Sequence, residues 1–161
     1  ANIALATTPF PKGTNGTQFD SVARSVLWRG GLHYMHGTGH GVGWRLCVHE
    51  GPHSIRMDWR PEPLCPGMTV TDEPGVYIEG QFGIRTENMM LVVESELGAP
   101  FLRLEPLTLC PIDTAPIDLS LMTKEETEWL NKYHARVRTE LLPLLTDEQD
   151  REWLTNATKP I

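Results

Sequence analysis

The sequence predicts an α+β chain in which a curved antiparallel sheet of short strands carries helices on its outer face. Two observations support this prediction: apolar residues at helical spacing near both ends of the chain, and short apolar stretches broken by Gly and Pro between them. The 161 residues include 14 Gly and 13 Pro without a period, which favours turns and short strands over a helix bundle. With 40% hydrophobic and 22% charged residues, the chain is able to bury a core.

The first expected element is a short extended or helical segment within residues 1–16, which ends in a turn. A helix is expected over residues 17–30, because apolar residues recur there at helical spacing and Gly30-Gly31 is a good stop. Strands are then expected over residues 68–78, 84–94 and 102–109. The first of these strands breaks at Pro74-Gly75, since proline cannot serve a central ladder.

Helices are expected again near the end of the chain, where two capping boxes occur. The first spans Thr123–Glu126 and precedes one apolar helix face, and Pro143 ends that helix. The second box spans Thr146–Gln149 and opens a short helix. The predicted order is therefore helix, antiparallel strands, helices.

Composition excludes several classes of function. The net charge of −7 and the absence of a basic stripe argue against nucleic-acid binding. No apolar run approaches the roughly 18 residues that span a membrane, so no membrane association is expected. Three cysteines lie far apart without a CxxC pair, which fits a reducing compartment and predicts a cytoplasmic location.

The unusual part of the sequence is residues 32–53, which hold five of the six histidines. Glycine alternates through the first part of this segment, and glycine lets a backbone approach a ligand or metal closely. A lone histidine is usually structural, but five within 21 residues indicate a binding or metal site. These five are His33, His36, His40, His49 and His53.

Carboxylates follow in the expected strands. Glu73 precedes Pro74-Gly75, and Arg85 and Glu87 are two residues apart, so both are expected on one face of a strand. A carboxylate among apolar neighbours is costly to bury unless it is paired or metal-bound. Imidazole with carboxylates suits a divalent-metal site, and oxygen-rich ligands favour Mn²⁺. The alternative is an Arg85–Glu87 pair on a solvated face, with the histidines bonded to the backbone.

Four motifs follow one another along the chain: HGTGHGVG at 36–43, VHEGP at 48–52, TDEPG at 71–75 and GIRTEN at 83–88. In this order they resemble the catalytic half of Xaa-Pro aminopeptidases (aminopeptidase P), which are di-metal peptidases with the pita-bread fold. The resemblance extends to residues 105–113, 129–134 and 159–161. It implies one partial catalytic domain over 1–161, with a metallopeptidase core at about 1–112 and a C-terminal helical extension at about 113–161.

The resemblance also implies roles for single residues. His40, Glu73 and Glu87 match metal ligands, with Glu87 as the bridging carboxylate. His36 and His49 match histidines that contact the substrate and the tetrahedral intermediate, and Arg85 matches an arginine that supports the metal site. His33 and His53 match no catalytic position, and we expect them to be structural.

The implied reaction removes the first residue from peptides whose second residue is proline. Two divalent ions, Mn²⁺ with Zn²⁺ or Co²⁺ as alternatives, activate a water. Glu73 accepts the proton of that water, and a metal and a histidine donor stabilise the oxyanion. The resemblance further implies a homodimer of the full-length protein.

One departure from the family pattern concerns its two remaining ligands, which are strand aspartates upstream of the histidine motif. Only Asp20 precedes His36, and it lies in the expected helix. We therefore expect the chain alone to bind metal weakly or not at all, as an inactive fragment. The alternative function is a non-catalytic protein that keeps the pita-bread frame for protein binding. The intact set of histidines, glutamates and arginine favours the peptidase.

Overall fold

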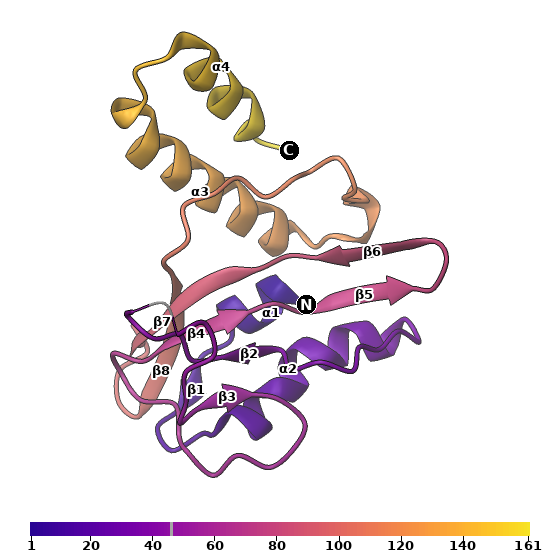
Figure 1. Ribbon diagram of the computed structural model, residues 1–161, viewed down its shortest axis with the longest axis vertical. Coiled ribbons are helices and arrows are strands. Elements are labelled where there is room, and N and C mark those ends of the chain that lie inside the picture. Colours follow the sequence, from indigo (N-terminus) through magenta and orange to yellow (C-terminus); the bar gives the residue numbers. More distant parts are fainter. Residues whose placement is uncertain (46) are drawn as a thin grey trace. The chain divides into compact units, whose positions relative to one another are not determined.

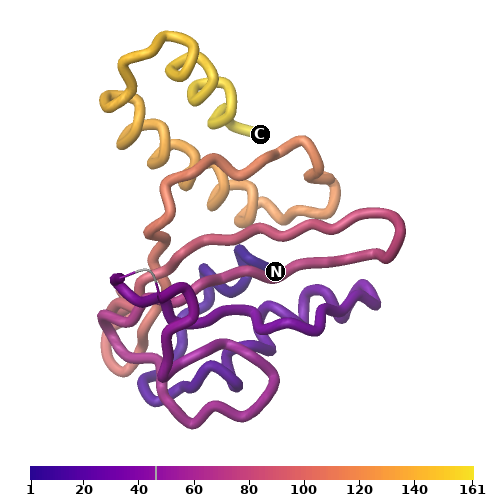
Figure 2. The backbone as a smooth tube through the Cα atoms, in the orientation of Figure 1, coloured from indigo at the N-terminus to yellow at the C-terminus, as the bar shows by residue number. Residues whose placement is uncertain are grey.

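The computed structural model describes residues 1–45 and 47–161, which form two compact units, residues 1–108 and 109–161 (Figures 1 and 2). Helices and antiparallel strands make up the first unit, and helices make up the second, so the α+β prediction is confirmed. The predicted organisation as one partial catalytic domain, with a core at 1–112 and an extension at 113–161, stays a prediction. The first unit contains α1 (Asn2–Thr7), β1 (Phe10–Pro11), α2 (Gly16–Arg29), β2 (Gly39–His40), β3 (Ser54–Ile55), β4 (Thr69–Asp72), β5 (Gly75–Ile78), β6 (Phe82–Arg85), β7 (Asn88–Glu94) and β8 (Phe101–Pro106).

The main sheet of the first unit has the antiparallel order β1-β8-β7-β4, and β2-β3 and β5-β6 form two further ribbons. Along β7 and β8, buried and partly exposed residues alternate, as expected for strands with one face on a core. The helix α1 contacts β8, β4 and α2, so it packs between the sheet and the longer helix. The buried apolar side chains of this layer include Leu5, Ala6, Phe10, Phe19, Ala23, Met90, Val92, Leu102 and Leu104.

The strand pairs β4–β7 and β5–β6 continue each other with a break between them. Asp72 lies opposite Asn88 before the break and Gly75 lies opposite Arg85 after it, so the register is the same on both sides. This register aligns Glu73 with Glu87 across the break. The expected single strand over 84–94 is therefore wrong at residues 86–87, and Arg85 and Glu87 do not share one strand.

The break has a simple hydrogen-bonding cause. The Glu73 N–H donates to the carbonyl of Thr38 at 2.8 Å instead of to the partner strand. The next residue, Pro74, has no N–H to donate. Neither residue therefore donates a backbone hydrogen bond to residues 86–87, and the antiparallel pairing resumes only at β5 and β6.

The helix α2 begins one residue earlier than expected, because Asn15 caps it. The Asn15 side chain accepts from the Gln18 N–H at 3.0 Å, and the Gln18 side chain accepts from the Asn15 N–H at 3.0 Å. These two bonds form a capping box, which satisfies two free donors at the helix start. The helix ends at Arg29, next to the predicted Gly30 stop.

The second unit contains η1 (Leu119–Leu121), α3 (Lys124–Leu141), η2 (Leu142–Leu144) and α4 (Glu148–Ala157). The predicted capping box at the start of α3 is confirmed, with Thr123 and Glu126 bonded to each other's backbone. The second predicted box is wrong, because Asp147 rather than Thr146 caps α4 and accepts from Gln149 and Asp150. An Asp carboxylate accepts both N–H groups at once and also favours the positive end of the helix dipole. The core of this unit consists of Leu130, Tyr133, Val137 and Leu154.

The last residues of the chain are tied to α3 by side-chain bonds. The Asn131 amide donates to the Ile161 carbonyl at 3.2 Å and accepts from the Ile161 N–H at 3.0 Å. Arg138 donates to the Thr158 carbonyl at 2.9 Å. Within the described residues, no helix is both long and apolar enough to cross a membrane.

The histidine outside the 32–53 segment, His134, is fully buried in the second unit. Its Nε2 accepts from the Ile112 N–H at 3.1 Å, so the ring proton lies on Nδ1. Burial lowers the pKa of His134, because the protonated ring cannot be solvated there.

Truncating the sheet core should destabilise the first unit. Leu104 is 2% exposed, and Leu104→Ala should lower the free energy of unfolding by about 2–5 kcal/mol, because it leaves a cavity. Urea denaturation followed by tryptophan fluorescence measures the change. Leu107→Ala, at a residue 40% exposed, is the matched control and should cost much less. Equal losses in the two variants would contradict the assignment of this core.

The buried His134 should make the stability of the second unit depend on pH. Below about pH 6.5 the unfolded chain binds a proton at this histidine that the folded chain does not, so the free energy of unfolding falls as the pH falls, by up to about 1.4 kcal/mol per pH unit. His134→Gln keeps a hydrogen-bond acceptor but does not titrate. Between pH 7 and pH 5, the free energy of unfolding of this variant should therefore change less with pH than that of the wild type. Asn156→Gln, at an exposed residue of the same unit that does not titrate, should keep the wild-type slope. Parallel slopes for all three proteins would refute this role of His134.

Candidate active site

The histidine motif lies on β2 and on the irregular segment before it, held close to β4. A Cβ placed on Gly39 would lie 1.8 Å from the Thr71 carbonyl oxygen, so only glycine allows this approach of the two backbones. Beside it, β2 pairs with β3, and Gly41 forms a bridge with Val70. The contact brings His40, from one part of the chain, next to residues 71–73.

His40 has a fixed ring orientation. Its Nδ1 lies 2.9 Å from the Gly41 carbonyl, which can only accept, so Nδ1 carries a proton, and in the neutral ring Nε2 presents a lone pair. That Nε2 lies 3.1 Å from Oε1 of Glu73. The His40 N–H donates to the Thr71 hydroxyl at 3.0 Å, which fixes the backbone as well.

Glu73 stands in the break between β4 and β5 and is held at both carboxylate oxygens. Its Oε1 accepts from the Thr71 hydroxyl at 3.0 Å, and its Oε2 lies 3.7 Å from Nε of Arg85. The side chain is only 12% exposed, whereas that of Arg85 is 42% exposed. The Thr71 hydroxyl and the Arg85 guanidinium thus orient the carboxylate, and its Oε1 also faces the His40 ring.

His36 and Tyr77 form a second pair next to this centre. His36 Nδ1 lies 2.7 Å from the Gly37 carbonyl, so the ring proton is again on Nδ1, and Nε2 lies 3.1 Å from the Tyr77 hydroxyl. In the neutral ring, Tyr77 therefore donates to His36. The two rings meet edge to face at 5.4 Å, and the guanidinium carbon of Arg85 lies 5.7 Å from the centre of the Tyr77 ring.

The remaining predicted residues lie around these two groups. The ring of His49 is 4.3 Å from that of His40, centre to centre. Glu87 is exposed and opposite Glu73 in register. Over residues 1–45 and 47–161, no three His, Cys, Asp or Glu side chains are grouped to hold a metal. The structure thus brings His40 and Glu73 together, and it does not gather all three predicted ligands into one cluster.

The two histidines expected to be structural have ordinary partners. His53 is 7% exposed, and its Nε2 bonds to the Thr69 carbonyl at 2.7 Å. His33 accepts from the Trp28 indole N–H at 3.1 Å.

Sequence reasoning missed Thr71 and Tyr77 as parts of the site. Thr71 links the His40 backbone to the Glu73 carboxylate, and Tyr77 bonds to His36. Both are common strand residues. A usable signal was their spacing from the glutamate of the TDEPG motif, two residues before it and four after it.

The donor set at the centre suits a divalent cation. One imidazole nitrogen with its lone pair free and one ionisable carboxylate face each other, and both are ligands of Mn²⁺, Zn²⁺ and Co²⁺. The Gly41 carbonyl orients the imidazole and the Thr71 hydroxyl orients the carboxylate, as is common for metal ligands.

Residues 1–94 match the metallopeptidase family M24, and residues 100–161 match the C-terminal region of peptidase M24. "Aminopeptidase P1" of Lotus japonicus is 49% identical over 99% of this chain and 25% of its own length. "Probable Xaa-Pro aminopeptidase P" of Coprinopsis cinerea is 48% identical over 99% of this chain and 27% of its own length. The chain thus spans about a quarter of the length of these relatives.

Solved structures agree with the sequence matches. X-prolyl aminopeptidase from Caenorhabditis elegans, described as a cytosolic enzyme with a di-nuclear active site, has a TM-score of 0.91 and 43% identity over 99% of this chain and 27% of its own. Prolidase from Pyrococcus furiosus has a TM-score of 0.53 and 31% identity over 64% of this chain and 28% of its own. The curled antiparallel sheet with its helices is the pita-bread fold of these enzymes, and the chain belongs to metallopeptidase family M24.

Proposed function

We propose that this chain is the C-terminal part of the catalytic domain of a metal-dependent aminopeptidase that releases the first residue of peptides with proline second. One observation carries the proposal: Nε2 of His40 faces the Glu73 carboxylate and lies 3.1 Å from its Oε1. In the neutral ring, whose proton is directed to Gly41, two electron-rich groups face each other, and a cation bound by both removes their repulsion. The names of the relatives supply the reaction.

The residues that would hold the metal are His40, Glu73 and Glu87. Glu87 is included because the register aligns it with Glu73 and because the resemblance makes it the bridging carboxylate. We infer two divalent ions in the complete enzyme, with Mn²⁺ as the first choice and Zn²⁺ or Co²⁺ as alternatives. The di-nuclear active site of the Caenorhabditis elegans relative supports the number.

The chemistry of the site divides between the metal and this chain's residues. When bound, the ions would supply a water of lowered pKa and a Lewis-acid contact for the scissile carbonyl. Glu73 accepts the proton, because its carboxylate is held at hydrogen-bond distance from His40 and Thr71 and keeps its orientation while it does so. Arg85 steadies the second oxygen of that carboxylate.

His36 and His49 bind the peptide in this proposal. The ring proton of His36 is held by the Gly37 carbonyl, so its Nε2 and the Tyr77 hydroxyl form the polar pair open to a substrate. The His49 ring lies beside that of His40, tilted against it, and would contact the developing oxyanion. Proline has no N–H and a fixed φ, so the bond before it needs a dedicated pocket.

The cellular setting is inferred in the same way. We place the protein in the cytoplasm, because the Caenorhabditis elegans relative is described as cytosolic and the three cysteines of this chain are free. We also expect a homodimer of the full-length protein, acting on Xaa-Pro peptides. A non-catalytic protein-binding role requires neither the fixed tautomer of His40 nor the held Glu73, so the peptidase is preferred.

Removing the base should abolish turnover. In the complete protein with Mn²⁺, Glu73→Gln should lower kcat on an Xaa-Pro peptide by about 100-fold or more, because the amide cannot take up the proton. Release of the first amino acid, followed by chromatography, measures the rate. Glu79→Gln, at an exposed residue of the β5–β6 turn, is the control and should keep wild-type activity. Undiminished turnover by Glu73→Gln would exclude Glu73 as the base.

The isolated 161-residue chain should not cleave the same peptide when Mn²⁺ is added. Three of the five ligands of the family are present in it, so at most one ion is weakly held and no water is fully activated. Titration calorimetry with Mn²⁺ and the peptide assay, run beside the complete protein, test both statements. Robust hydrolysis by the purified chain would show that it carries a complete centre.

A further inference from the structure

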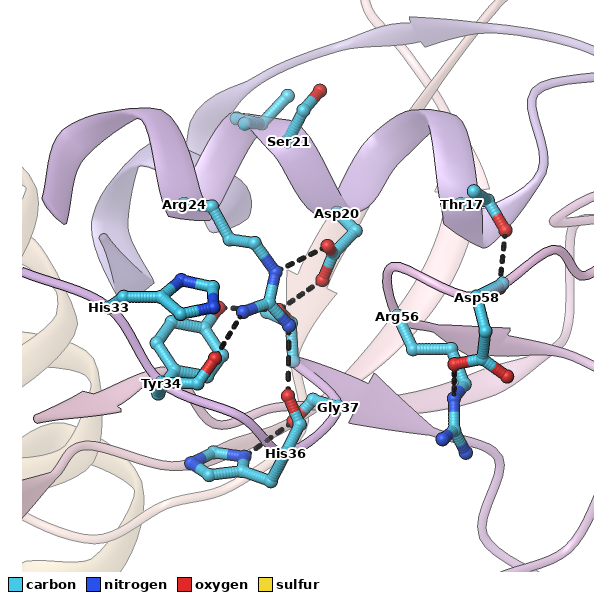
Figure 3. A network of polar contacts seen from close by, with 12 residues as sticks. Thr17, Asp20, Ser21, Arg24, His33, Tyr34, His36, Gly37, Arg56 and Asp58 are labelled. Carbon is cyan, nitrogen blue, oxygen red and sulfur yellow. Dashed lines mark hydrogen bonds and ion pairs between the residues drawn. The ribbon is translucent and has the colours of Figure 1, made fainter. Parts of the chain in front are cut away.

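A buried ion pair on α2 contacts the histidine motif and the residues just before it, Tyr34 to Thr38. The side chains of Asp20 and Arg24 are 3% and 1% exposed, and Nε of Arg24 donates to a carboxylate oxygen of Asp20 at 2.5 Å. They are four residues apart on one helix face, where Phe19 and Ala23 are also buried. Figure 3 shows the guanidinium between this helix and the segment that carries His36.

Both terminal nitrogens of Arg24 donate to the backbone of residues 34–36. Its Nη1 donates to the Tyr34 carbonyl at 2.7 Å and its Nη2 to the His36 carbonyl at 2.8 Å (Figure 3). The guanidinium also lies 4.0 Å from the centre of the Tyr34 ring, and that ring is 4.8 Å from the ring of His36. One side chain therefore fixes the backbone of His36 and the aromatic surface behind its imidazole.

Asp20 extends this set of hydrogen bonds to Thr38. Its second oxygen accepts from the Thr38 hydroxyl, and Thr38 in turn accepts from the Tyr34 hydroxyl at 2.5 Å. Burial raises the pKa of Tyr34, so this hydroxyl keeps its proton and remains a donor. The Thr38 carbonyl accepts from the Glu73 N–H, which connects the network to the backbone of the candidate metal ligand Glu73.

A role in stability alone accounts poorly for this arrangement. Burying two charges costs several kcal/mol for each, and their mutual attraction only offsets this cost. Proteins in which apolar residues replace a buried ion pair are often as stable as the original. The specific feature is the fork of Arg24, which meets two carbonyls of a segment that has no regular secondary structure. Such a segment has no backbone hydrogen bonds of a helix or sheet to fix it. The two terminal nitrogens of Arg24 instead bond to the carbonyls on either side of residue 35 and fix the backbone there.

We propose that Arg24, held by Asp20, is a positioning residue that sets the place and orientation of His36. This inference rests on the proposed function only in giving His36 a contact with the peptide. Arg24 itself does not touch the substrate. It acts through its bond to the His36 carbonyl and through the Tyr34 ring.

Arg24→Lys in the complete protein tests the proposal, because lysine keeps the charge beside Asp20 but cannot bond to both carbonyls. We expect kcat on an Xaa-Pro peptide to fall by about 10- to 100-fold with little change in KM. Hydrogen exchange of residues 34–38 should accelerate, and that of residues 101–106 should not. Arg103→Lys, which changes a partly exposed arginine on β8, is the matched control and should alter neither.

A double-mutant cycle separates positioning from a general loss of structure. In a His36→Ala background, Arg24→Lys should lower kcat by less than about threefold, since the residue it positions is gone. Equal losses in both backgrounds would overturn the proposal, as would wild-type exchange at residues 34–38. If His36→Ala has wild-type kcat while exchange still accelerates in Arg24→Lys, the proposed function fails and the positioning stands.

A second variant keeps the test open if Arg24→Lys does not fold. Tyr34→Leu leaves the backbone carbonyl and the ion pair but removes the ring between Arg24 and His36. It should lower kcat in the wild-type background and have little effect in the His36→Ala background. Tyr34→Phe keeps the ring and should have a smaller effect than Tyr34→Leu; equal effects of the two would overturn the role of the ring.

Discussion

The site depends on the close approach of Gly39 to the backbone of Thr71. Because no side chain separates β2 from β4 at this point, the His40 N–H reaches the Thr71 hydroxyl, and that hydroxyl also donates to Glu73. One residue earlier, the Thr38 carbonyl takes the Glu73 N–H. A single contact between two strands thus sets both the imidazole and the carboxylate of the candidate centre. A larger residue at position 39 would separate them.

The sequence predicts the regular elements well, because these are determined by local patterns. Helical spacing and caps predict α2 and α3, and the Pro74-Gly75 break separates β4 from β5. The matching break at residues 86–87 is not local: it follows from the bond of the Glu73 N–H to Thr38, thirty-five residues away in the chain. The start of α4 was misplaced because Thr146 and Asp147 are both good caps, and only the structure shows which one bonds.

The motifs predict which residues belong to the candidate site, but they predict the contacts among these residues less well. His40 and Glu73 are together as expected, whereas Thr71 and Tyr77 look like ordinary strand residues until register and ring contacts are known. Arg24 was missed for a similar reason. In sequence, an Asp and an Arg four apart on a helix suggest a solvated pair, and only tertiary packing shows that they are buried against the histidine motif.

Neighbouring carboxylates at the end of β4 have opposite environments. Asp72 is fully buried, and burial raises the pKa of its carboxyl well above the ordinary value. Glu73 is also buried, but its carboxylate is bonded to Thr71 and lies near Arg85, whereas both carboxylate oxygens of Asp72 are buried without a hydrogen bond to any residue that the structure describes. Successive residues of an extended chain point to opposite sides, so a single step along the backbone separates a carboxyl of the interior from one of the site. Position in the strand, more than residue type, decides which of the two is available for chemistry.

The shared register on both sides of the break has a consequence for how the family can vary in length. Glu73 and Glu87 are aligned by pairs at residues 72 and 88 and again at 75 and 85, so the turn at 79–81 does not determine their alignment. Residues can be inserted or lost at that turn without moving either glutamate. A single residue inserted within β5 or β6 would instead shift the pairing between the insertion and the turn by one place and turn those side chains to the other face. This hairpin therefore accommodates a change of length at its tip and not along its arms.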